Sequence, residues 1–136
     1  MKIEFTEEEQ RAINSIRSEK LKGIYVYLVY NAQNLQNIRA EQRDRETKLS
    51  FLYLVGERPQ QHFSFIVNSE WLLFYIEEIA LNNWPEIEER LRQHGIECYP
   101  DLANSRKKRF RVEDEKPLIF IREILTDYDN RLSEMA

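Results

Sequence analysis

Residues 48–68 read KLSFLYLVGERPQQHFSFIVN, and this stretch decides the fold. Residues 48–55 predict a strand, residues 56–60 supply turn formers, and residues 61–68 predict the next strand. In the second strand Phe63, Phe65 and Val67 alternate with polar side chains, the pattern of a strand with one face against the core. The stretch therefore predicts two antiparallel strands joined by a short turn.

The segments before this hairpin predict a helix and a further strand. Thr6 and Glu9 fit a capping box that opens a helix, which Gly23 would close. Residues 24–30 are apolar or aromatic at every position and mostly strand formers, so we expect a strand covered on both faces. Residues 31–47 are polar and charged, and they predict either a mobile loop or a short helix.

The segments after the hairpin predict strands and two helices. Residues 71–76 fit a fourth strand or the start of a helix capped by Ser69, and we favour the strand. A middle helix is expected over about 84–94, closed by Gly95. Short strands are expected at 96–99 and 108–112.

The C-terminal segment carries the clearest helical pattern, over about 116–133. Its apolar positions recur at spacings of three and four: Leu118, Ile121, Leu125, Tyr128 and Leu132. This stripe would pack on the sheet or pair with another subunit, which leaves a homodimer through the C-terminal helix open.

The order of these elements indicates the α+β class. We expect one domain spanning residues 1–136, with an antiparallel sheet of four to six strands, an N-terminal helix, the middle helix and the C-terminal helix. Strands clustered with short connections favour an antiparallel sheet with helices on one face.

Composition favours a cytoplasmic protein outside the membrane. The one cysteine, Cys98, fits a reducing compartment, and the acidic N-terminus lacks the pattern of a secretory signal. No apolar run approaches the ~20 residues of a membrane span. The chain also lacks a glycine-rich phosphate loop, a nucleophile elbow and enough Cys and His for a structural zinc site, so we predict no cofactor and no metal.

One segment concentrates positive charge in an otherwise acidic chain of net charge −4. The basic segment consists of Arg106, Lys107, Lys108, Arg109, Phe110 and Arg111. Its cations could neutralise the phosphates of DNA or RNA, and Phe110 could stack on an exposed base. In a strand over 108–112, Lys108 and Phe110 share one face while Arg109 and Arg111 share the other. Two other interpretations are a solvated segment balanced by the acidic residues 113–115, and a contact for an acidic protein partner.

A second motif is acidic. Pro100-Asp101 is followed after twelve residues by Asp114-Glu115-Lys116, a spacing that resembles the PD-(D/E)xK nuclease motif. The resemblance implies that Asp101 and Asp114 hold a magnesium ion and that Lys116 helps to activate the attacking water. In the alternative interpretation, the acidic residues 113–115 stabilise the start of the last helix.

These observations favour a non-enzymatic binding or regulatory protein that contacts nucleic acid through residues 106–111. One alternative is a protein–protein interaction module, such as an inhibitor, an antitoxin or an immunity-type partner. The other is a magnesium-dependent nuclease.

Overall fold

The predicted hairpin forms the middle of the sheet. The computed structural model describes residues 4–45 and 48–135. Strands β2 (Lys48–Val55) and β3 (Gln60–Val67) are antiparallel, with Phe51 opposite Phe65. Gly56, in the turn between them, has φ 93°, a left-handed conformation that glycine adopts without strain. The hairpin prediction is confirmed.

Four further strands extend this hairpin into a sheet. They are β1 (Ile38–Arg45), β4 (Leu72–Ile76), β5 (Tyr99–Pro100) and β6 (Lys108–Val112). Within the described residues the sheet has six strands in the order β1-β2-β3-β4-β6-β5, and all neighbours are antiparallel. The predicted α+β class is therefore confirmed, as is the strand favoured for residues 71–76.

The strand predicted for residues 24–30 is wrong, because these residues belong to helix α2 (Glu19–Ala32). The hydroxyl of Ser18 accepts a hydrogen bond from the Leu21 amide at 3.2 Å and caps this helix. Its buried side chains recur at helical spacing: Leu21, Ile24, Tyr25, Leu28, Val29 and Ala32. Apolar residues also occupy the less buried side of the helix, so the helical spacing of the buried positions could not be recognised in the sequence.

Helix α1 (Glu7–Ser15) begins as predicted and ends early. The Thr6 hydroxyl accepts from the Glu9 amide at 3.1 Å, and the Glu9 carboxylate accepts from the Thr6 amide at 2.9 Å. This is the expected capping box. The helix does not continue to Gly23, which lies inside α2, because Ser18 starts a new helix.

Residues 38–45 form strand β1, where a loop or short helix was expected. Its whole length pairs with β2, from Ile38 opposite Val55 to Arg45 opposite Lys48. The side chains of Ile38 and Gln42 are buried, and the Gln42 carbonyl oxygen accepts from the Tyr25 hydroxyl at 2.7 Å. This strand is formed by pairing with β2, since its polar sequence has low intrinsic strand propensity.

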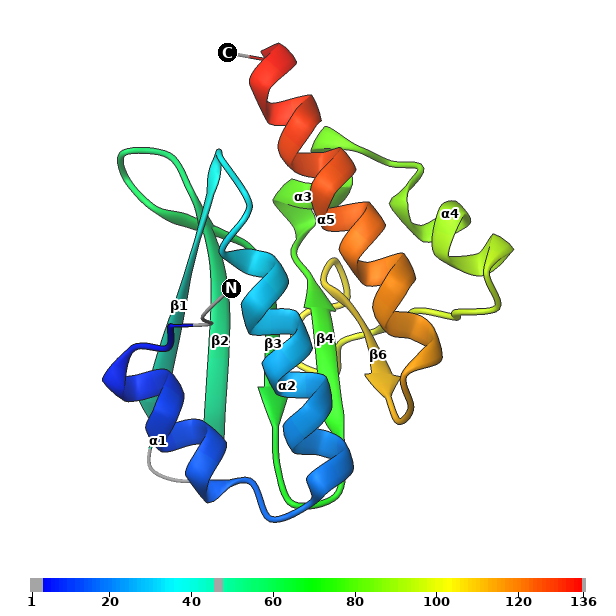
Figure 1. Ribbon diagram of the computed structural model, residues 1–136. Coiled ribbons are helices and arrows are strands. Elements are labelled where there is room, and N and C mark those ends of the chain that lie inside the picture. The colour runs from blue at the N-terminus through cyan, green and yellow to red at the C-terminus, as the bar shows by residue number, and fades with distance from the viewer. Residues whose placement is uncertain (1–3, 46–47, 136) are drawn as a thin grey trace.

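The remaining helices follow β4 and β6. They are the short α3 (Glu78–Asn83), the predicted middle helix α4 (Ile87–Gln93), which precedes Gly95 at φ 79°, and the predicted C-terminal helix α5 (Lys116–Met135). Helices α2 and α5 contact each other and cross the same face of the sheet (Figure 1). The apolar stripe of α5 is buried within the chain, so it packs on the chain's own core.

The helix layer and the sheet enclose one hydrophobic core, and residues 36–37 are fastened to it by α5. The buried carboxylate of Asp129 accepts hydrogen bonds from the amides of Gln36 and Asn37 at 2.9 and 2.7 Å. The described helices include none with the length and apolar character needed to cross a membrane. The sheet face away from α2 and α5, called the open face below, carries the candidate site.

Candidate nucleic-acid interface

Sheet register places two arginines of the basic segment on the open face. Directly opposite residues of antiparallel strands point to the same side of a sheet. Arg109 lies opposite Tyr75, which lies opposite Ser64. Ser64 lies opposite Leu52, and Leu52 lies opposite Glu41 of β1. These five side chains form one row across five strands.

A second, parallel row begins at the other arginine. Arg111 lies opposite Leu73, which lies opposite Ile66. Ile66 lies opposite Ser50, and Ser50 lies opposite Arg43. Arg43 at one margin and Arg111 at the other thus end the same row, about 19 Å apart at the usual spacing between strands.

A groove of about 310 Å³ lies between these margins. Its lining residues come from β1, β2, β3, β4 and the end of the loop before β6: Arg43, Ser50, Leu52, Gln61, Ser64, Ile66, Tyr75 and Lys107. Apolar side chains and two hydroxyls therefore form the floor, and a cation stands at each side.

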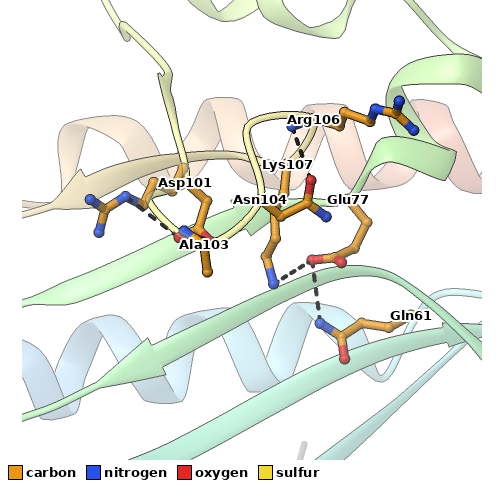
Figure 2. A network of polar contacts seen from close by, with 8 residues as sticks. Gln61, Glu77, Asp101, Ala103, Asn104, Arg106 and Lys107 are labelled. Carbon is orange, nitrogen blue, oxygen red and sulfur yellow. Dashed lines mark hydrogen bonds and ion pairs between the residues drawn. The ribbon is translucent and has the colours of Figure 1, made fainter.

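The loop of residues 101–107 carries the basic segment onto the open face. The Asp101 amide donates to the Lys107 carbonyl at 2.8 Å and closes this loop. In Figure 2 the loop lies in front of the strands and the helices lie behind them. The Lys107 ammonium lies 2.8 Å from the Glu77 carboxylate and 4.6 Å from the centre of the Tyr75 ring. It therefore covers Tyr75 with a charge that Glu77 balances.

Three other cations of the segment have acidic partners. Arg106 lies 3.6 Å from Glu78, Arg109 lies 3.9 Å from Asp101, and Arg111 lies 3.7 Å from Glu113. Arg106 and Arg111 are mainly exposed, so these pairs are solvated, and such pairs contribute only about 0–1 kcal/mol each. Lys108 makes no ion pair with a described residue.

Phe110 lies in the core. Its side chain is 4% exposed, and its ring centre lies 5.5 Å from that of Phe74. Strand β6 alternates as expected, with Phe110 and Val112 inward and Arg109 and Arg111 outward. The expectation that Phe110 stacks on a base is therefore corrected, because the alternation that presents the arginines buries its ring.

The three residues of the nuclease-like motif are not brought together. Asp101 lies beside Lys107 and Arg109 at the start of β6, whereas Asp114 lies beyond its end and accepts from the Lys116 amide at 3.0 Å. A strand of five residues spans roughly 15 Å, too far for two carboxylates to share one ion. No group of three or more potential ligands able to hold a metal occurs in the described part of the chain.

The sulfhydryl of Cys98 and the imidazole of His62 have structural surroundings. Burial raises the pKa of the Cys98 thiol to about 12, so the thiol stays protonated near neutral pH and is a poor nucleophile. His62 is buried, with its Nδ1 atom 2.6 Å from the Tyr128 hydroxyl, and burial lowers its pKa.

Sequence analysis missed the residues that complete the open face. Arg43 lies in a segment of mixed charge, and Tyr75 lies in an apolar run that indicated core packing. Arg43 and Arg111 are 68 positions apart in the chain, and only the sheet order makes them members of one row. Residues 71–76 show no alternation of polar and apolar side chains that would have placed Tyr75 on the open face.

Comparisons of this chain with protein-family models, curated proteins and solved structures found no match. The geometry of the open face is therefore the basis for the proposed function.

Proposed function

We propose that this protein is a non-enzymatic binding protein that contacts nucleic acid through the basic segment on the open face. The observation that carries the proposal is the register of β6, which directs Arg109 and Arg111 outward and places Arg111 in the row that ends at Arg43. Arg106 and Lys107 extend the same margin, whereas Lys108 shares the opposite face of β6 with Phe110. Cations in such a line can contact the phosphates of a nucleic acid whatever its nucleotide sequence, which supports contact with the sugar–phosphate backbone.

The acidic partners determine how strong this contact is. A phosphate that approaches Arg111 takes the place of Glu113, and breaking this exposed pair costs about 0–1 kcal/mol. The pair of Arg109 and Asp101, at 3.9 Å, is largely shielded from solvent, so Arg109 is less accessible to a phosphate. The chain is also acidic overall, at net charge −4. We therefore expect binding that is modest at physiological salt and that weakens steeply as salt is raised.

The test measures binding of labelled oligonucleotides of about 12 nucleotides by fluorescence anisotropy, at about 50 and 200 mM salt. The double variant Arg109→Ala/Arg111→Ala should weaken binding about tenfold or more. It should also make the slope of log affinity against log salt concentration less steep, by the amount expected for roughly two phosphate contacts. The matched control is Arg17→Ala/Arg122→Ala, which removes two exposed arginines on the helix side. Equal losses in both double variants, or no binding by the unaltered protein, would overturn the proposal.

An acidic protein partner is the second candidate, and exposed apolar residues beside the basic segment favour it. Leu102 is 92% exposed at the loop and Tyr99 is 57% exposed on β5. Tyrosine and arginine are enriched where protein interfaces concentrate their binding energy. A protein partner would lose affinity in Tyr99→Ala and Leu102→Ala, whereas phosphate contact would not. The raised pKa and free state of Cys98 are compatible with the cytoplasmic location that we propose for either activity.

A further inference from the structure

Two serine side chains in the groove on the open face make no hydrogen bond within the described residues. Ser64 is 4% exposed and lines the groove, and its hydroxyl makes no hydrogen bond to a described residue. Ser50, in the neighbouring row, lines the same groove and likewise makes no side-chain hydrogen bond within the described residues. Both hydroxyls are open to the groove, so they are available to donate to or accept from a ligand that binds there.

The size and lining of the groove restrict what that partner is. A volume of about 310 Å³ is at the lower end for small-molecule sites. Leu52, Ile66 and Tyr75 offer an apolar floor, while the two serines and Gln61 offer donors and acceptors. This combination suits a flat ring with polar edges, such as a nucleobase.

The positive charges around the groove indicate that the ligand also carries anionic groups. Lys107 stands at one side of the groove and Arg43 stands at the other. Arg43 pairs with the exposed Glu41 carboxylate at 2.8 Å, and Arg111 ends the row of Arg43. A ligand with anionic groups on both sides of a flat ring would meet a cation at each side. Phosphates of a single strand that runs across the groove, on either side of an unpaired base, have this arrangement.

We infer that the groove holds an unpaired base of a single-stranded nucleic acid, with Ser64 and Ser50 at its polar edge and Arg43 and Lys107 at the flanking phosphates. The inference rests on the proposed function and narrows its ligand to single strands. In a duplex the bases are stacked and paired, so only the phosphates reach the open face. Lys107 exchanges Glu77 for a phosphate when the strand binds, which uncovers the Tyr75 ring for the base.

The experiment compares one sequence of about 12 nucleotides as single-stranded RNA, single-stranded DNA and duplex DNA, with the full chain and the same anisotropy assay. The unaltered protein should bind single strands about tenfold more tightly than the duplex. Ser64→Leu, which fills the groove, should reduce single-strand affinity to the duplex level and leave duplex affinity unchanged. Ser69→Leu, in the exposed β3–β4 turn, is the matched control and should change neither.

Each further outcome decides between the two claims. Equal affinity for single strands and duplex, or unchanged single-strand affinity in a folded Ser64→Leu variant, would overturn the groove inference and leave backbone contact standing. Weakening of both single-strand and duplex binding by about tenfold or more in Arg109→Ala/Arg111→Ala supports backbone contact separately. If Ser64→Leu does not fold, Arg43→Ala removes an exposed groove side chain without touching the core and should lower single-strand affinity more than duplex affinity. Binding of no nucleic acid would overturn both claims.

Discussion

Tyr53 combines good ring packing with an unpaired hydroxyl. Its ring contacts Phe51, Phe63 and Phe74 in the core, at centre-to-centre distances of 5.3, 6.4 and 6.1 Å. The hydroxyl has no hydrogen-bond partner among the described residues, and burial raises its pKa far above the ordinary value. An unsatisfied buried donor of this kind costs about 1–3 kcal/mol.

Tyr53→Phe should therefore raise the free energy of unfolding by about 1 kcal/mol, because it removes the unpaired hydroxyl and keeps the ring. Urea denaturation followed by circular dichroism measures the change. Tyr25→Phe is the matched control, and it should lower stability by about 1 kcal/mol because the Tyr25 hydroxyl donates to Gln42. A stability loss in Tyr53→Phe would show that the hydroxyl has a partner.

The basic segment illustrates how neighbouring residues in a strand receive opposite roles. Arg109 and Arg111 point to the open face, and Phe110 between them points into the core. The sequence predicted this alternation, and it also proposed that Phe110 meets a base. Both expectations cannot hold, because side chains alternate along a strand: when Arg109 and Arg111 face outward, Phe110 faces the core.

At the scale of elements, α2 was the largest error of sequence analysis. Its strand formers would suit a buried strand, yet the Ser18 cap and the buried positions at spacings of three and four make it a helix. Gly23 lies in its interior and is exposed, and a Cβ added there would meet no atom within 4 Å. The helix thus carries a glycine with no packing role.

Gly23→Ala should raise the free energy of unfolding by about 0.5–1 kcal/mol, because alanine restricts the unfolded chain more and fits the helix without strain. Thermal or urea unfolding detects the change. Gly95→Ala makes the informative contrast, since φ is 79° there and an alanine should destabilise by about 1 kcal/mol or more. No gain in Gly23→Ala would contradict the helical assignment of residues 24–30.

At the scale of the whole molecule, a buried polar contact joins the sheet to the helix layer. Asn83 donates to the Tyr128 hydroxyl at 2.9 Å, and that hydroxyl lies 2.6 Å from Nδ1 of His62. This hydrogen bond between the Tyr128 hydroxyl and the imidazole links β3 to α5. Burial lowers the pKa of His62 below its ordinary 6.5, so the folded chain resists the proton that the unfolded chain accepts.

Stability should consequently fall as pH falls through 6.5, the value expected for this histidine in the unfolded chain. From about pH 7.5 to about pH 5.5 the contribution lost is up to about 1.4 kcal/mol. His62→Asn, whose amide oxygen can occupy the place of Nδ1, should show a smaller loss over the same range. Urea denaturation at both pH values measures it, and equal losses in the two proteins would rule out His62 as the source.

The candidate site was predictable only in part. Charge density in the sequence identified Arg106, Lys107, Lys108, Arg109 and Arg111. It could not identify Arg43, Ser50 or Ser64, because their shared groove depends on which strands are neighbours. The nuclease-like spacing failed for the same reason, since twelve intervening residues do not determine whether two carboxylates meet.

By itself the sequence determined the hairpin of β2 and β3, the strand β6, the helix α5 and the antiparallel α+β class. These depend on local signals: alternation, turn residues and helical periodicity. Only the tertiary structure decided that residues 24–30 are helical, that residues 38–45 pair as an edge strand, and that Phe110 is buried. The physical reason is that burial and strand pairing join residues far apart in the chain, and their free energy outweighs local propensity.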